Sequence, residues 1–238
     1  MEFTNFVFLL YAIIVGGNKE SHGRSRRTYD GQLFYILNLS VILGIKMVLL
    51  EDKRSKKVAI VAHCLLNQNA KVNGFAFYSS MIKQIVDMLH SKDFGIIQLP
   101  CPETLFSGLR RWWYVREQYD TPGFKSHCRR ILQPIVDQIE EYQSEGYKII
   151  IIGLDGSPSC GVSVSGSSDS WGGAPRLPEG QYGNYPTTEK PGIFIQELMS
   201  MMDERKIRIP PMIGAGFDMP NFDPSVIEGK IMEFISRA

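Results

Sequence analysis

The sequence predicts an α/β protein, a doubly wound Rossmann-like or flavodoxin-like domain with a mainly parallel sheet. From residue 57 onward, short apolar runs alternate with longer segments in which apolar residues recur at helical spacing. This alternation of strand and helix is typical of parallel sheets that are covered by helices. The run Lys148–Leu154 contains four consecutive isoleucines, as expected for a central strand that is buried on both faces.

The order of these patterns defines the expected elements. Strands are predicted at Val58–Ala62, Ile96–Leu99, Lys148–Leu154 and Ile207–Ile213. Helices are predicted at Phe77–Ser91, Pro122–Gly146, Ile193–Arg205 and Pro224–Arg237. We expect Thr121 to cap the second helix and Pro134 to kink it. The last strand contains two prolines and should therefore lie near an edge of the sheet. The Gly-, Ser- and Pro-rich stretch Val162–Thr188 should be a long loop, either functional or disordered.

The composition limits the class of protein. The chain has 238 residues, of which 44% are hydrophobic and 21% are charged, as is usual for a soluble globular protein. Its net charge of +1 provides no strong field for nucleic acid or an anionic membrane, so neither is expected as a partner. The four cysteines form no CxxC pair, which argues against a compact zinc module or a disulfide scaffold. Reduced thiols in the cytoplasm are the expected state.

Residues 1–46 differ from the rest of the chain and are predicted to be separate from a domain at 47–238. Their two apolar runs, Phe6–Val15 and Leu33–Ile45, both fall short of the ~20 residues that a membrane-spanning helix needs. We favour translation from upstream of the true start, with Met47 as the initiator. A signal or membrane anchor is one alternative, and a structured extension is another. No membrane association is expected for residues 47–238.

Three cysteines follow predicted strands. Cys64, Cys101 and Cys160 each come just after a short apolar run. Because the carboxyl ends of parallel strands face one crevice where ligands bind, these thiols are expected to meet there. Three thiolates without an obvious fourth ligand suit an iron–sulfur cluster with one open iron.

Other interpretations of the cysteines are open. Buried cysteines are often small hydrophobic residues without a special function, and a single cysteine could act as a nucleophile. A zinc site could use the three thiols, or two of them with His63. If Cys64 points into the crevice, however, His63 should point to the opposite face in an extended segment. Cys128, inside the predicted long helix, is expected to pack in the core.

Three motifs resemble those of a known family. The segments CLL…NG (from Cys64), CPE…GL (from Cys101) and SPSCG (from Ser157) resemble the thiouracil desulfurase family and its desulfidase branch, once an uncharacterised domain. The resemblance covers about Val58 to Ile213. It implies that Cys64, Cys101 and Cys160 hold a [4Fe–4S] cluster, whose fourth iron takes the sulfur of a thiocarbonyl substrate.

The same resemblance implies catalytic residues. The acid–base glutamate of the family corresponds to Glu103 and its serine to Ser157. A carboxylate two residues from a ligand suits the activation of water. The serine is suited to hydrogen-bond the substrate or pass a proton, although such serines also cap turns.

The sequence departs from the family pattern near the expected substrate. The family's arginine–tyrosine–aspartate before a glycine is replaced by Lys71, Val72 and Asn73, and the segment after CPE is rich in aromatic residues. Trp112, Trp113 and Tyr114 are expected either to pack or to stack on a planar heterocycle. These changes leave the substrate's identity open.

The sequence thus predicts a [4Fe–4S]-dependent desulfidase that releases sulfide from a small thiolated compound. A cluster-containing sulfur carrier is an alternative of another class. A third is a cluster-free α/β domain with a nucleophilic cysteine. Oligomeric state is not predicted.

Overall fold

The computed structural model describes residues 52–171, 186–219 and 221–238. The chain divides between Lys53 and Arg54, and all described elements belong to the second unit, Arg54–Ala238. The interpretation of residues 1–46 falls outside the described residues, as does the middle of the predicted loop Val162–Thr188. Within the described part of the chain, no helix is long and apolar enough to cross a membrane.

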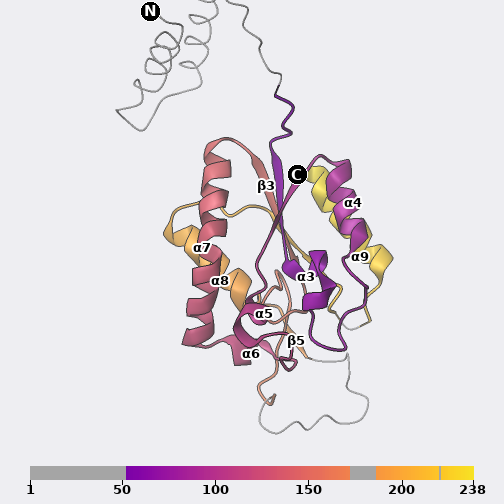
Figure 1. Ribbon diagram of the computed structural model, residues 1–238, viewed down its shortest axis with the longest axis vertical. Helices are drawn as coiled ribbons and strands as arrows, with labels where there is room; N and C mark the ends of the chain where they lie inside the picture. Colours follow the sequence, from indigo (N-terminus) through magenta and orange to yellow (C-terminus); the bar gives the residue numbers. More distant parts are fainter. Residues whose placement is uncertain (1–51, 172–185, 220) are drawn as a thin grey trace, which may run out of the picture. The chain divides into compact units, whose positions relative to one another are not determined.

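A four-stranded sheet with all strands parallel forms the centre of this unit (Figure 1). Its strands are β1 (Lys57–Val61), β2 (Gly95–Gln98), β3 (Lys148–Leu154) and β6 (Met212–Ala215). They lie in the order β2-β1-β3-β6. The predicted α/β class and parallel sheet are therefore confirmed. Flavodoxin-like folds share the order 2-1-3 and bind their ligand at the switch point between the first and third strands.

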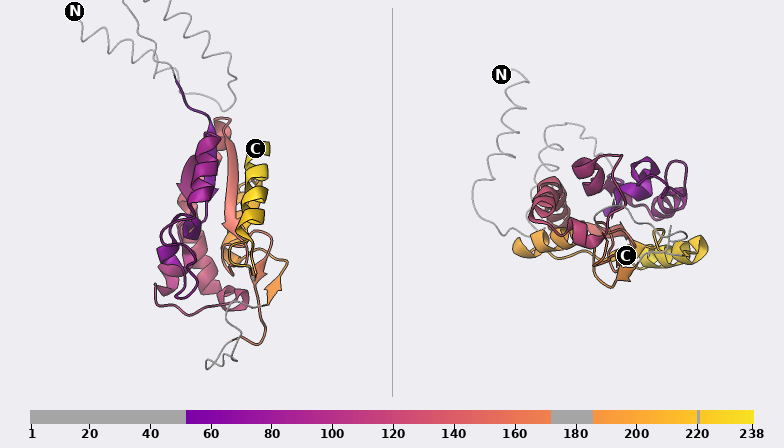
Figure 2. Two further views of the ribbon diagram at one scale, coloured as in Figure 1. Left: turned by 90° about the vertical axis from the view of Figure 1, so that its right-hand side faces the viewer. Right: turned by 90° about the horizontal axis from the view of Figure 1, so that it is seen from below.

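Helices cover both sides of the sheet, as a doubly wound fold requires. On one side, α7 (Pro122–Ser144) packs against α8 (Ile193–Glu204). On the other side, α4 (Lys83–Ser91) packs against α9 (Pro224–Arg237), as Figures 1 and 2 show. The isoleucines of β3 are buried between these layers, as their sequence predicts.

The helix boundaries follow local chemistry. The hydroxyl of Thr121 accepts a hydrogen bond from the backbone N–H of Phe124 at 3.3 Å, so the predicted cap of α7 is present. The helix ends at Ser144, and Gly146 adopts a φ of 74°, a left-handed conformation that glycine takes without strain. Pro134 lies inside α7.

Two predicted elements begin later than expected. The segment from Phe77 to Ile82 is not helical, because the backbone N–H of Ile82 donates to Leu65 and the carbonyl of Ser80 accepts from Gln68. These tertiary bonds replace the first helical turn, and Phe77 remains 56% exposed. The fourth strand begins at Met212 rather than Ile207, because the preceding Pro210 and Pro211 have no N–H for a ladder. It does lie at an edge of the sheet, as predicted.

Short elements at the strand ends were not predicted. They are α3 (His63–Leu66), the 3₁₀ helix η1 (Gln68–Ala70), α5 (Pro102–Ser107) and α6 (Arg116–Tyr119). The ends of the predicted loop also pair with each other as β4 (Ser165–Gly166) and β5 (Thr187–Thr188). Helices of one turn carry too few residues to show a period in the sequence.

Gly153 in β3 allows the Cys160 segment to fold back on the strand. A Cβ atom at Gly153 would lie 2.5 Å from the carbonyl oxygen of Cys160 and 2.5 Å from a methyl group of Val162. We expect Gly153→Ala to lower the free energy of unfolding by about 1–3 kcal/mol through overpacking. Urea denaturation measures this change.

Gly229→Ala is the matched control, because a Cβ at this position in α9 meets nothing within 4 Å. That substitution should raise stability by about 0.5–1 kcal/mol through helix propensity. Equal effects of the two substitutions would show that the close approach at Gly153 is unimportant.

Candidate functional site

The three cysteines that follow strands lie at the same end of the sheet. Cys64 is in α3 after β1, Cys101 precedes α5 after β2, and Cys160 follows β3. They are 9%, 5% and 4% exposed. The thiols of Cys64 and Cys101 hydrogen-bond to each other. Cys160 is close enough for its charge to act on Cys64 and for the charge of Cys101 to act on it. The structure therefore brings the three predicted ligand residues together.

The neighbouring thiols differ in acidity. The hydrogen bond from Cys64 lowers the pKa of Cys101 to about 6. The same hydrogen bond holds the proton on Cys64 and raises its pKa, while burial raises the pKa of Cys160. The pair of Cys64 and Cys101 therefore favours one shared proton at neutral pH. Such a group of thiols can donate to a soft metal once the protons leave.

The described part of the chain contains no ready-made site for a single metal ion. Among the described residues, no three His, Cys, Asp or Glu side chains are arranged to hold one ion. The ring of His63 instead contacts Gln98 at 2.6 Å and Asn67 at 3.4 Å. His63 lies in a helical turn, so the prediction of an extended segment at this point was wrong. The zinc interpretation, which needs thiolates ~2.3 Å from a common point, gains no support.

Asp155 fixes the turn that carries Cys160. Its Oδ1 atom accepts backbone hydrogen bonds from Val162 at 2.8 Å and Ser163 at 2.9 Å. The backbone N–H of Cys160 donates to the Oγ of Ser157 at 3.1 Å. Ser157 thus caps the turn, as one interpretation of the sequence expected, and it also lines the pocket. The turn is held from both sides by side-chain acceptors.

Glu103 is buried and both of its carboxylate oxygens have partners. Arg111 Nε donates to Oε2 at 2.9 Å, and the Ser159 hydroxyl donates to Oε1 at 2.6 Å. Arg111 is held in turn by the carbonyl oxygens of Ala70 at 2.8 Å and Gly108 at 3.3 Å. The carboxylate therefore has a fixed position at the start of α5, beside Cys101.

A row of oxygen atoms connects Glu103 to the pocket. The Ser159 hydroxyl, which donates to Glu103, is 3.3 Å from the hydroxyl of Ser157. Serine hydroxyls can both donate and accept hydrogen bonds. Glu103, Ser159 and Ser157 can therefore pass a proton along one line.

Tyr119 adds a neutral phenol beside this row. Burial and the nearby Glu103 charge both raise its pKa, so the hydroxyl keeps its proton. It is buried, and it makes no hydrogen bond of good geometry with any described residue. It lies close to the carboxylate without donating to it.

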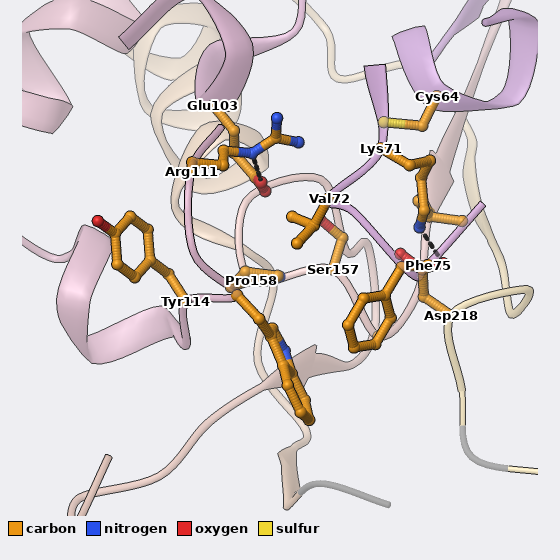
Figure 3. A pocket seen from close by; sticks show the side chains of 13 residues that line it. Cys64, Lys71, Val72, Phe75, Glu103, Arg111, Tyr114, Ser157, Pro158 and Asp218 are labelled. Atoms are coloured by element: carbon orange, nitrogen blue, oxygen red, sulfur yellow. Dashed lines mark hydrogen bonds and ion pairs between the residues drawn. The ribbon is translucent and has the colours of Figure 1, made fainter. Parts of the chain in front are cut away.

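One pocket adjoins Cys64, Glu103 and Ser157 (Figure 3). Its cavity volume is about 40 Å³, and its empty space is about 440 Å³ when the open solvent at its mouth is included. Its lining consists of Cys64, Lys71, Val72, Phe75, Glu103, Arg111, Trp113, Tyr114, Leu154, Gly156, Ser157, Pro158 and Asp218.

The aromatic residues of the pocket come from two segments. The rings of Phe75 and Trp113 are 4.9 Å apart between centroids, and Trp113 is 5.0 Å from Trp171. Of the three aromatic residues singled out in the sequence, Trp113 and Tyr114 line the pocket. Trp112 is 71% exposed.

Sequence reasoning missed several residues of this site. Ser159 is the second serine of SPSCG, so its motif was noticed but its contact with Glu103 was not. Lys71 was noticed only as a departure from the family pattern. Arg111 and Asp218 gave no sequence signal, because each reaches the site from a segment without a recognisable motif.

The fold and the site define an α/β protein with buried thiols and a fixed carboxylate beside a pocket. The family described as "Putative 2-thiouracil desulfurase" matches residues 56–174, which include all three cysteines and Glu103. An uncharacterized protein of Methanocaldococcus jannaschii is 38% identical over 109 residues, covering 46% of this chain and 70% of that protein. No solved structure shows significant similarity. The chain belongs to the family that carries this description.

Removing one partner of the Arg111–Glu103 ion pair is predicted to destabilise the fold. Both side chains are buried, at 2% and 10% exposed. Arg111→Met should therefore lower the free energy of unfolding by about 3–5 kcal/mol, because it leaves a buried carboxylate unpaired. Arg205→Met, which removes partly exposed pairs with Asp137 and Glu140, should change stability little. Thermal unfolding of both variants tests this, and similar small losses would contradict it.

Proposed function

We propose that this chain is a [4Fe–4S]-dependent desulfidase that releases sulfur as sulfide from a small thiocarbonyl compound. Membership of the desulfurase family supports the removal of sulfur. The observation that carries the finer proposal is the group of three buried thiols beside the pocket that holds Glu103 and Ser157. A cytoplasmic location, where thiols stay reduced, suits such a group.

The donor set fits an iron–sulfur cluster. In this proposal Cys64, Cys101 and Cys160 are the ligands, and thiolates are the usual ligands of such clusters. Each thiolate of a cluster binds a different iron, so the sulfurs need not surround a single point. The absence of a single-ion site among the described residues is therefore compatible with cluster binding. A cluster with three protein ligands supplies an open iron that can bind and polarise a thiocarbonyl sulfur.

The remaining steps fall to the side chains of this chain. Replacement of C=S by C=O consumes one water and releases one hydrogen sulfide, with no net transfer of electrons. Glu103 is placed to take the proton of the attacking water, directly or through Ser159 and Ser157. The same row of oxygens can return a proton to the departing sulfur. Arg111 and Ser159 keep the carboxylate oriented during both transfers.

A nucleophilic cysteine is the second candidate function, and the surroundings of Cys101 favour it. The lowered pKa of Cys101, caused by the hydrogen bond from Cys64, gives it thiolate character at neutral pH. A cluster-free enzyme could attack the substrate with this thiolate. Iron and acid-labile sulfide, quantified after anaerobic purification, separate the two candidates.

The catalytic residues are tested by substitution. Glu103→Gln should keep the iron content but lower sulfide release by about 10²–10⁴-fold, which is the usual contribution of positioned proton transfer. Ser157→Ala should lower activity with iron retained, because it interrupts the row of oxygens. Sulfide release from a panel of thiocarbonyl compounds is the measurement. Full activity in Glu103→Gln would remove this carboxylate from the mechanism.

The ligand residues are tested separately. Cys64→Ala, Cys101→Ala and Cys160→Ala should each lose iron, whereas Cys128→Ala should retain it. Cys128 is a matched control, because it is also fully buried but lies inside α7, where burial raises its pKa to about 12. Retention of iron in any of the first three variants would show that the cysteine concerned is not a required ligand.

A further inference from the structure

Lys71 and Asp218 form a buried ion pair in the wall of the pocket. Their side chains are only 6% and 12% exposed, and both line the pocket. Burying two charges often costs as much as their attraction returns, and apolar replacements of similar volume are frequently neutral or stabilising. A contribution to fold stability therefore does not explain well why this ion pair is present. Because both residues line the pocket, a role in binding a ligand is the better explanation.

The pair lies on a different side of the pocket from the acid–base residues. Figure 3 shows Lys71 and Asp218 near Cys64, with Ser157 between them and the Glu103–Arg111 pair. The ammonium group of Lys71 and the thiol of Cys64 are close enough for each to shift the pKa of the other. A compound bound beside the thiols would therefore come within reach of the ammonium group.

The ammonium group of Lys71 retains hydrogen-bonding capacity. Lysine has three N–H donors, and within the described residues the Nζ atom hydrogen-bonds only to Asp218. The buried carboxylate of Asp218 fixes the position of Nζ and balances its charge. At least one donor thus remains for an acceptor in the pocket, which an uncharged side chain of similar length would lack.

We propose that Lys71 is a specificity-determining residue that donates a hydrogen bond to an exocyclic oxygen of a planar thiocarbonyl substrate, with Asp218 as its positioning residue. This inference rests on the proposed function and narrows its substrate class to rings with C=S and a second, oxygen acceptor. Phe75 and Trp113 supply aromatic surface for such a ring. Asp218 lies outside the family match at 56–174, so a segment beyond that match completes the recognition site.

The test compares two substrates that differ in one oxygen. 2-Thiouracil carries a ring carbonyl that pyrimidine-2-thione lacks. With the cluster-loaded protein, kcat/KM should favour 2-thiouracil, mainly through KM. Lys71→Met should reduce this preference by about 10–100-fold, the value of one hydrogen bond to a charged group. It should change the rate with pyrimidine-2-thione much less, and Lys71→Arg should keep most of the preference.

Lys83→Met is the matched control. Lys83 also pairs with an aspartate, Asp87, but this pair is exposed on α4, outside the pocket. Its loss should leave the substrate preference unchanged. The double variant Lys71→Met/Asp218→Leu replaces the whole buried pair with apolar side chains. It therefore tests the same preference without an unpaired buried carboxylate, should the single variant fail to fold.

Ligand binding gives a readout that does not depend on turnover. Calorimetry should show that the cluster-loaded protein binds uracil more tightly than pyrimidin-2-one, and that Lys71→Met removes the difference. If Lys71→Met or the double variant keeps the wild-type preference, or if the wild type binds both rings equally, the inference is wrong. Failure of the proposed function looks different, because the wild-type protein would then release no sulfide from any thiocarbonyl compound.

Discussion

The parallel pairing of β1 with both of its neighbours is the constraint on which the site depends. Val61, at the end of β1, pairs with Gln98 of β2 and with Ile152 of β3. The three strands therefore end at nearly the same level, and the chain leaves each of them toward the same crevice. This register brings three distant cysteines to one place. A shift in register would move one cysteine away from the other two, and it would exchange the faces on which that strand's side chains lie.

Short turns after the three strands fix the positions of the cysteines. After β1 the chain forms one turn of helix, after β2 the sulfur of Cys101 accepts a hydrogen bond from Thr104 at 3.4 Å, and after β3 the carboxylate of Asp155 holds the turn. Each turn satisfies backbone groups that the end of a strand would otherwise leave unpaired in a buried place. The arrangement keeps the thiols, Glu103 and Ser157 in place without a long mobile loop between them.

Two buried ion pairs then give the pocket its polarity. Arg111 faces Glu103 on one side, and Lys71 faces Asp218 on another. The Lys71–Asp218 pair joins segments 147 positions apart in the sequence, whereas Glu103 and Arg111 are 8 positions apart. Low dielectric strengthens these interactions and makes an unpaired member costly. The same property makes fixed charges effective at orienting a substrate, because little solvent reorganises around them.

The sequence by itself determined the sheet, the main helices and the candidate ligands, because long periodic patterns and strand-end motifs are local properties of the chain. Buried isoleucines marked β3, and the SPSCG and CPE motifs marked Cys160, Cys101 and Glu103. Only the tertiary structure decided where α4 begins, that Ser159 rather than Ser157 touches Glu103, and that Arg111 and Asp218 reach the pocket. These features depend on contacts between segments that the register of the sheet brings together, and no local pattern encodes such contacts.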